Sequence, residues 1–166
     1  HLEGFGSEEG VKKGKGELYD YLRNNNGRAF VMSDYDYLVS MSAGLSEVIT
    51  YGNKTGALQA TAATVNGFLQ VNFLKGTPIE TIQTQLVGEY NLPNILAAVS
   101  IGLYFKVPAD KIKHAIENYA PSNSRSQLIK WKGNDVILDA YNANPSSMQL
   151  AIENFSKLSA AHKIVC

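Results

Sequence analysis

The first third of the chain alternates between helical and extended patterns of apolar residues. Apolar side chains recur every three or four positions over residues 10–23, which predicts an amphipathic helix. Short apolar runs at residues 29–32 and 48–51 predict buried strands. Between these runs, Asp34 can cap a second helix that Gly44 ends. This order of elements predicts a parallel sheet flanked by helices.

The pattern changes to period two in the middle of the chain. Residues 58–64, 67–74 and 80–86 are rich in Thr, Val and aromatic side chains and alternate between apolar and polar. Turn sequences separate them at Asn66-Gly67 and at residues 75–78. We therefore expect an antiparallel meander that covers the edge of the parallel sheet.

Two apolar helices follow the meander, over residues 95–104 and from Pro108 onward. The short polar segment Pro121-Ser122-Asn123-Ser124 then separates two apolar-rich parts of the chain. On this basis we predict one domain over residues 1–121 and the beginning of another over residues 122–166.

The second part predicts two strands, a turn and a helix. The strands are expected at 127–131 and 135–138, and the helix begins with Asn144 as N-cap and Pro145 as its first residue. Asp139 lies directly after the second strand, where open α/β sheets place ligand-binding residues. A role for Asp139 in shaping the turn is an equal alternative.

Composition narrows the functional classes. Lys and Arg together number 15, as do Asp and Glu, so a net charge of zero argues against nucleic acid or an anionic membrane as a partner. No apolar run approaches the roughly 20 residues that cross a bilayer. A single cysteine, Cys166, fits a reducing compartment. The chain starts at His1 and ends in an apolar run typical of a strand, so we expect a fragment of a longer protein.

The chain lacks the common sequence signatures of independent catalysis. It contains no Gly-x-x-x-x-Gly-Lys-Ser/Thr loop for phosphate, and Gly4-Phe5-Gly6 lacks the third glycine of a dinucleotide site. No paired Cys or His residues have the spacing of a metal site. Function has to be inferred from other motifs.

Those motifs resemble the Mur ligase family. They are residues 1–7, 14–17, 90–98, 124–125 and 139–148, in the order in which the family has them. The resemblance implies an α/β fold: the later half of a central ATPase domain, with parallel sheet, helices and meander, and the start of a Rossmann-like carboxy-terminal domain. It also implies a cytoplasmic, monomeric, ATP- and Mg²⁺-dependent enzyme that forms an amide bond in peptidoglycan synthesis.

The resemblance assigns four residues to the nucleotide. Asn91 and Asn94 match an Asn-x-x-Asn motif on the adenine side of ATP, where an amide can both donate and accept hydrogen bonds. An N-cap pair on a buried helix is the structural alternative. Arg125 matches an arginine near ribose or phosphate, and Asp139 an aspartate at the ribose hydroxyls.

Four further residues are implied to serve metal and catalysis. His1 matches a magnesium ligand, although imidazole is an unusual ligand for a hard cation, so a surface histidine is the alternative. Lys15 matches a lysine that relatives carbamylate, or else is a solvated helix residue. Asn142 and Asn144 fall in the loop that faces the reacting groups.

The loop sequence at 139–145 favours the family member that joins D-alanyl-D-alanine to UDP-N-acetylmuramoyl-tripeptide. Alternatives are the ligase that adds the third amino acid, a folylpolyglutamate synthetase, or a non-catalytic nucleotide-binding module of the same fold. Because no phosphate-binding loop is present, we expect these 166 residues alone to be inactive.

Overall fold

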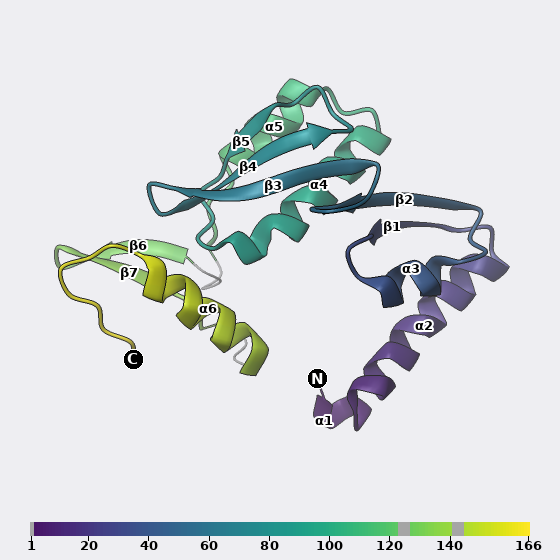
Figure 1. The fold of residues 1–166 in the computed structure, drawn as a ribbon, viewed down its shortest axis with the longest axis horizontal. Coiled ribbons are helices and arrows are strands. Elements are labelled where there is room, and N and C mark those ends of the chain that lie inside the picture. The colour runs from purple at the N-terminus through teal and green to yellow at the C-terminus, as the bar shows by residue number, and fades with distance from the viewer. Residues whose placement is uncertain (1, 123–126, 141–144) are drawn as a thin grey trace.

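The computed structural model describes residues 2–122, 127–140 and 145–166, and its elements follow the expected order (Figure 1). The elements of the first part are α1 (Leu2–Phe5), α2 (Glu8–Asn24), β1 (Arg28–Met32), α3 (Asp36–Ser42), β2 (Glu47–Gly52), β3 (Leu58–Val65), β4 (Phe68–Lys75), β5 (Thr81–Gln83), the 3₁₀ turn η1 (Glu89–Asn91), α4 (Leu92–Tyr104) and α5 (Ala109–Glu117). Those of the second part are β6 (Gln127–Trp131), β7 (Asn134–Leu138) and α6 (Pro145–Lys157).

One sheet of five strands in the order β1-β2-β3-β4-β5 organises the first part. Strands β1, β2 and β3 run parallel, and β3, β4 and β5 are antiparallel. The meander therefore covers the β2 edge of the parallel strands, and it does so by continuing the sheet through the pairing of Tyr51 with Leu58. Asn66 (φ 52°) and Gly67 (φ 84°) join β3 to β4 in the left-handed conformation that two-residue hairpins need.

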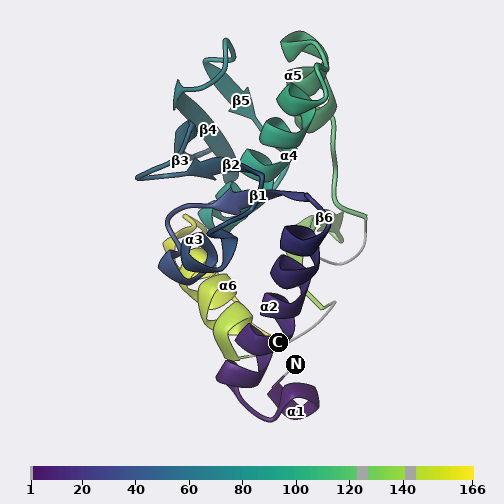
Figure 2. The ribbon, with the colours of Figure 1, turned by 90° about the vertical axis from the view of Figure 1, so that its right-hand side faces the viewer.

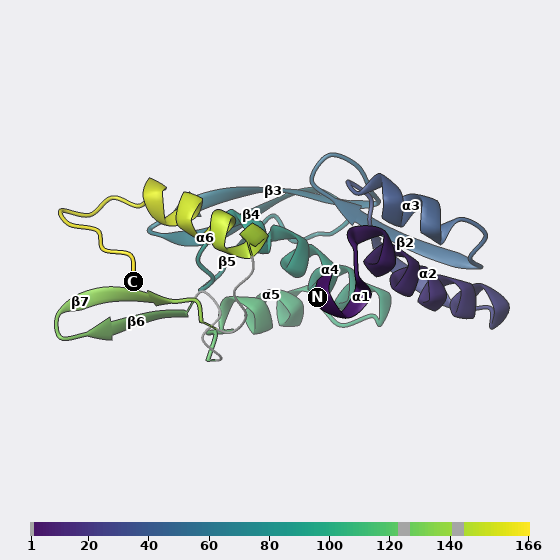
Figure 3. The same ribbon diagram turned by 90° about the horizontal axis from the view of Figure 1, so that it is seen from below.

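Helices α4 and α5 lie on one side of the sheet and α3 on the other (Figures 2 and 3). The hydrophobic core forms on the α4 side, where both β-strand and helix residues are fully buried. Its largest fully buried side chains are Leu69, Val71, Ile82, Leu96 and Val99. Because α4 packs against β3 and β4 in this core, the core fixes the position at which α4 begins.

Helix α2 begins earlier and is less buried than the sequence predicts. Ser7 caps it, since the Ser7 hydroxyl accepts a hydrogen bond from the Gly10 N–H at 3.0 Å, so the helix starts two residues earlier than expected. None of the α2 residues is buried, and two members of its apolar stripe, Leu18 and Tyr21, are 60% and 64% exposed. These two side chains are therefore not covered by the described part of the chain.

The second part forms a β6–β7 hairpin followed by α6. Every member of the hydrophobic core described above lies between Tyr51 and Ile116, outside these elements. The domain boundary at residues 121 and 122 stays a prediction. Residues 162–166 are irregular, so the strand expected there is not formed, and no described helix is long and apolar enough to cross a membrane.

Candidate nucleotide-binding site

The start of α4 is shaped by a glycine. Gly88 has φ 95°, and a Cβ placed on it would lie 2.2 Å from a ring carbon of Tyr90. Both its conformation and its surroundings therefore exclude a larger residue. The chain turns at Gly88 into η1 and then into α4, with Pro93 in the first turn, where a missing N–H costs nothing.

Two predicted residues, Asn91 and Asn94, form a hydrogen-bonded pair at this helix start. The Asn91 side-chain amide donates to the Val87 carbonyl at 3.0 Å, and the Asn94 amide donates to the Asn91 Oδ1 at 3.2 Å. Asn91 is half-buried and Asn94 is exposed. Asn91 occupies the N-cap position, but its side chain makes no capping hydrogen bond. The pair uses the nitrogen of the exposed Asn94 amide, and the oxygen of this amide can accept a hydrogen bond from a ligand.

The other predicted residues that the structure describes lie on different elements. Lys15 is exposed on α2, and Asp139 is exposed directly after β7. Among the described residues, no hydrogen bond or ion pair joins Lys15 to Asn91 or Asn94. The positions predicted at His1, Arg125, Asn142 and Asn144 lie outside the described residues.

The described residues include no group of three or more His, Cys, Asp or Glu side chains that could hold a metal ion. The described carboxylates therefore form no magnesium site that would support the prediction for His1.

Asp34 has a role that the sequence pattern did not indicate. It does not cap α3, whose N-cap is Tyr35 without a side-chain hydrogen bond. Instead its carboxylate accepts hydrogen bonds from the backbone N–H groups of Asn53, Lys54 and Thr55 at 2.6, 3.1 and 3.1 Å. An aspartate directly after a predicted strand was the available signal, but its partners are 19–21 residues away.

The Asp34 carboxylate joins the carboxyl ends of β1 and β2. Partial burial acts to raise the pKa of Asp34, but hydrogen bonds from the N–H groups of residues 53–55 and the Thr55 hydroxyl outweigh it and lower the pKa below its ordinary value. The Thr55 hydroxyl also donates to the Ser33 hydroxyl at 3.1 Å. Because Asp34 occupies these N–H donors, they are not available to an external anion.

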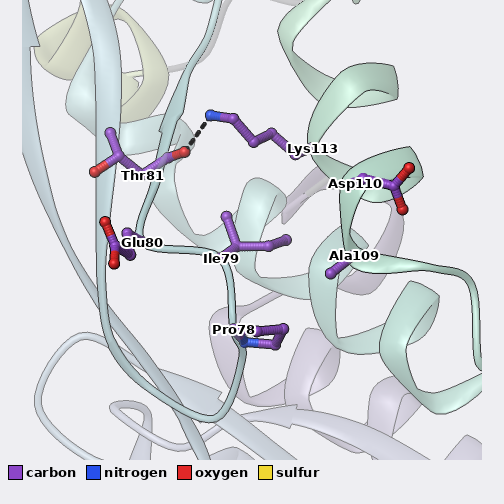
Figure 4. A pocket seen from close by; sticks show the side chains of 7 residues that line it. All are labelled: Pro78, Ile79, Glu80, Thr81, Ala109, Asp110 and Lys113. Carbon is purple, nitrogen blue, oxygen red and sulfur yellow. Dashed lines mark hydrogen bonds between the residues drawn. The ribbon is translucent and has the colours of Figure 1, made fainter.

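A surface cavity of about 400 Å³ lies between the segment before β5 and the start of α5 (Figure 4). None of the predicted site residues lines it, and its lining residues are Pro78, Ile79, Glu80, Thr81, Ala109, Asp110 and Lys113. The Lys113 ammonium donates to the Thr81 carbonyl and to the Glu117 carboxylate. These contacts pack α5 on β5 beside the cavity.

Known proteins are similar to this chain in sequence and in fold. Residues 1–102 match the family described as the Mur ligase middle domain. The UDP-N-acetylmuramoyl-tripeptide–D-alanyl-D-alanine ligase of Escherichia coli is 29% identical over 95% of this chain and 36% of its own length.

Two solved structures superpose on the chain. A crystal structure of MurF from Acinetobacter baumannii has a TM-score of 0.80 at 26% identity, over 96% of this chain and 35% of that one. MurF ligase from Thermotoga maritima in complex with ADP has a TM-score of 0.81 at 20% identity, over 96% and 37%, and shows the fold alone.

The chain spans about a third of the length of these proteins. The family match covers more than half of the chain, and the expected α/β fold is confirmed. The chain belongs to the Mur ligase family.

Proposed function

We propose that this chain is part of an ATP-dependent ligase that joins D-alanyl-D-alanine to UDP-N-acetylmuramoyl-tripeptide in peptidoglycan synthesis. Its similarity to a ligase of that name over 95% of the chain supports this choice of substrates. The structural observation that supports nucleotide binding is the hydrogen-bonded Asn91–Asn94 pair, which orients the exposed Asn94 side chain at the start of α4.

The reaction would proceed in two steps. A carboxylate oxygen of the tripeptide attacks the terminal phosphorus of ATP, which forms an acyl phosphate and releases ADP. The amine of D-alanyl-D-alanine then attacks the acyl carbon, loses a proton and expels phosphate, which leaves an amide. Both steps depend mainly on positioning and on neutralising charge at the phosphoryl group.

The nucleotide-binding roles that we propose belong to residues identified from the sequence. The Asn94 oxygen accepts a hydrogen bond from the amino group of adenine, while Asn91 orients the Asn94 amide. Asp139 accepts from the ribose hydroxyls, and Arg125 pairs with ribose or phosphate oxygens.

The remaining roles belong to the reaction centre. Lys15, in carbamylated form, would hold a cation, and the loop residues Asn142 and Asn144 would face the reacting groups. His1 would contribute to binding Mg²⁺, which would neutralise phosphate charge. A cytoplasmic, monomeric enzyme remains our prediction.

The choice of substrate can be tested with the intact protein encoded by the gene. Release of ADP is measured with UDP-N-acetylmuramoyl-tripeptide and either D-alanyl-D-alanine or single amino acids. We expect release with the dipeptide, whereas release only with a single amino acid would identify another ligase of the family. ATP binding without ADP release would identify a non-catalytic module. Residues 1–166 alone serve as a control, for which we expect no ligation.

Substitution of Asn94 with alanine in the intact protein is expected to raise the KM for ATP about tenfold. The loss of one hydrogen bond of about 1.4 kcal/mol accounts for this factor. The midpoint of unfolding should stay unchanged, because Asn94 is exposed. Asn91→Ala should raise KM similarly and also lower stability by about 1 kcal/mol, since the Val87 carbonyl loses its donor.

Asn118→Ala is a matched control for the Asn94 substitution. Asn118 is also an exposed asparagine next to a helix end, and its amide donates to the His114 carbonyl at 2.7 Å. Its replacement should leave the KM for ATP unchanged. An unchanged KM in Asn94→Ala would show that the pair only shapes the start of α4.

A further inference from the structure

The polar contacts that hold helix α2 in place lie at its carboxyl end. None of the α2 residues is buried, although Tyr19 and Leu22 are half-buried. Within the described part of the chain, no hydrogen bond or ion pair joins residues 8–22 to a strand or to α3. The position of α2 therefore depends strongly on what its last turn binds.

Arg23, in this last turn, binds the carboxyl end of the neighbouring helix α3. Its Nε donates to the Ala43 carbonyl at 3.0 Å, and its Nη2 donates to the Met41 carbonyl at 2.9 Å. Its Nη1 donates to the Asp20 carboxylate on α2 at 2.6 Å, which orients the guanidinium. The last carbonyl groups of a helix lack partners within the helix, and a cation there is favoured by the helix dipole. Arg23 supplies both the donors and the charge from a different helix.

The binding site for this guanidinium on α3 suits arginine in particular. Gly44 follows α3 with φ 78°, and a Cβ placed on it would lie 3.4 Å from the Arg23 Nε. A larger residue at position 44 would therefore be strained and would crowd the guanidinium. The planar fork of arginine reaches two carbonyls and a carboxylate at once, whereas the ammonium of a lysine is a single point of charge.

Helix α3 is itself attached to the sheet near both of its ends. The Ser46 hydroxyl, shortly after α3, lies 3.1 and 2.7 Å from the Asn26 and Gly27 carbonyls in the link that leads into β1. Just before α3, the Asp34 carboxylate binds the loop 53–55 at the carboxyl ends of β1 and β2. Figure 1 shows α3 beside the carboxyl-terminal half of α2. Through Arg23, α2 is thus connected to a helix that has a fixed place on the sheet.

The distance from Arg23 to Lys15 makes the position of Lys15 sensitive to this contact. The two residues are separated by about 12 Å along the helix axis, at about 1.5 Å per residue. A tilt of about 10° at the Arg23 end would therefore move Lys15 by about 2 Å. A displacement of about 1 Å at a reaction centre can lower the rate about a hundredfold.

We propose that Arg23 is a positioning residue, which sets the place of Lys15 relative to the carboxyl ends of β1 and β2 by holding α2 to α3. This proposal rests on the proposed function, which gives Lys15 a role at the reaction centre. Arg23 acts through α2 and does not itself contact substrate or nucleotide. An arginine in the last turn of a helix commonly binds the carbonyls of its own helix, so the sequence gave no sign of the contact with α3.

Kinetics of the intact protein provide the first test, with release of ADP measured on UDP-N-acetylmuramoyl-tripeptide and D-alanyl-D-alanine. Arg23→Gln should lower kcat at least about tenfold, because Lys15 is displaced. The KM for ATP should stay within about twofold, because Asn91 and Asn94 lie on α4, which the core holds. Arg23→Lys should retain more activity than Arg23→Gln, since an ammonium can still bind one carbonyl. An unchanged kcat, or a raised KM with unchanged kcat, would overturn the proposal.

Amide hydrogen exchange provides a readout that does not depend on activity. In Arg23→Gln, the amides of residues 12–22 should exchange at least about fivefold faster, whereas those of Leu96 and Val99 in α4 should not change. Equal acceleration in both helices would overturn the proposal, because Arg23 would then contribute only to general stability. If the wild type releases no ADP with any substrate, the proposed function fails, and exchange alone still decides whether Arg23 holds α2.

Arg28→Gln is the matched control. Arg28 is also an exposed arginine, and its Nε pairs with the Glu47 carboxylate at 3.4 Å between β1 and β2. Its replacement should change neither kcat nor the exchange of residues 12–22. Equal effects of the Arg23 and Arg28 substitutions would contradict a specific role for Arg23.

Discussion

Substitution of Leu96 with alanine is expected to lower the free energy of unfolding by about 3 to 5 kcal/mol. Leu96 is fully buried in α4 and packs in the core against the strands of the meander. The change removes apolar contacts and leaves a cavity that the surrounding side chains fill only in part. Because small domains have about 5 to 15 kcal/mol of stability, this one change removes a large part of it.

Urea unfolding followed by circular dichroism measures this loss. Ile101→Ala is the control, since Ile101 lies on the same helix and is 42% exposed. It should cost less than about 1 kcal/mol. Similar losses for both variants would show that α4 is not anchored through Leu96.

Substitution of Asp34 with alanine is expected to cost about 2 kcal/mol and to loosen residues 53–55. Three backbone N–H groups lose their carboxylate acceptor, and hydrogen bonds to charged groups are stronger than neutral ones. Hydrogen exchange of the Asn53, Lys54 and Thr55 amides should accelerate more than that of the β1 and β2 strands.

The Asp34 contribution should also depend on pH. Because the pKa of Asp34 is lowered in the folded state, the carboxylate stabilises the protein fully above its ordinary pKa of 3.8, and this stabilisation is lost as the pH falls through the lower folded value. The difference in stability between the wild type and Asp34→Ala should therefore shrink below about pH 4. Asp36→Ala, which changes an exposed aspartate in the first turn of α3, is the control. An equal loss in both variants would contradict the role of Asp34.

Local patterns predicted most elements, the parallel first strands and the antiparallel meander, but not the parallel pairing that joins them. The helices and strands follow from periodicity, and the turn at Asn66-Gly67 follows from residues that tolerate positive φ. The parallel pairing of β2 with β3 leaves no such local signal, because it joins segments through a short irregular loop. Strand β5 is shorter than expected because the Thr84 hydroxyl donates to the Leu69 carbonyl and accepts from the Leu86 N–H.

In the candidate site too, residues close in sequence could be predicted, whereas contacts between residues distant in sequence could not. Asn91 and Asn94 are three residues apart, so a sequence motif predicts both, and the structure adds which of the two amides faces solvent. Asp34 resembles an N-cap in the sequence, since caps are common after strands. Its true partners are distant in sequence and could not be inferred without the sheet.

The hairpin turn at Asn66-Gly67 also bears on the order in which the chain folds. Val65 pairs with Phe68 across the turn, so β3 and β4 can meet after closing a very short loop. Hairpins form within about 1 to 10 μs, whereas parallel pairs such as β1 and β2 need a crossover helix first. We therefore expect folding to begin in the middle of the chain, with α4 collapsing onto the hairpin before β1 and β2 join it.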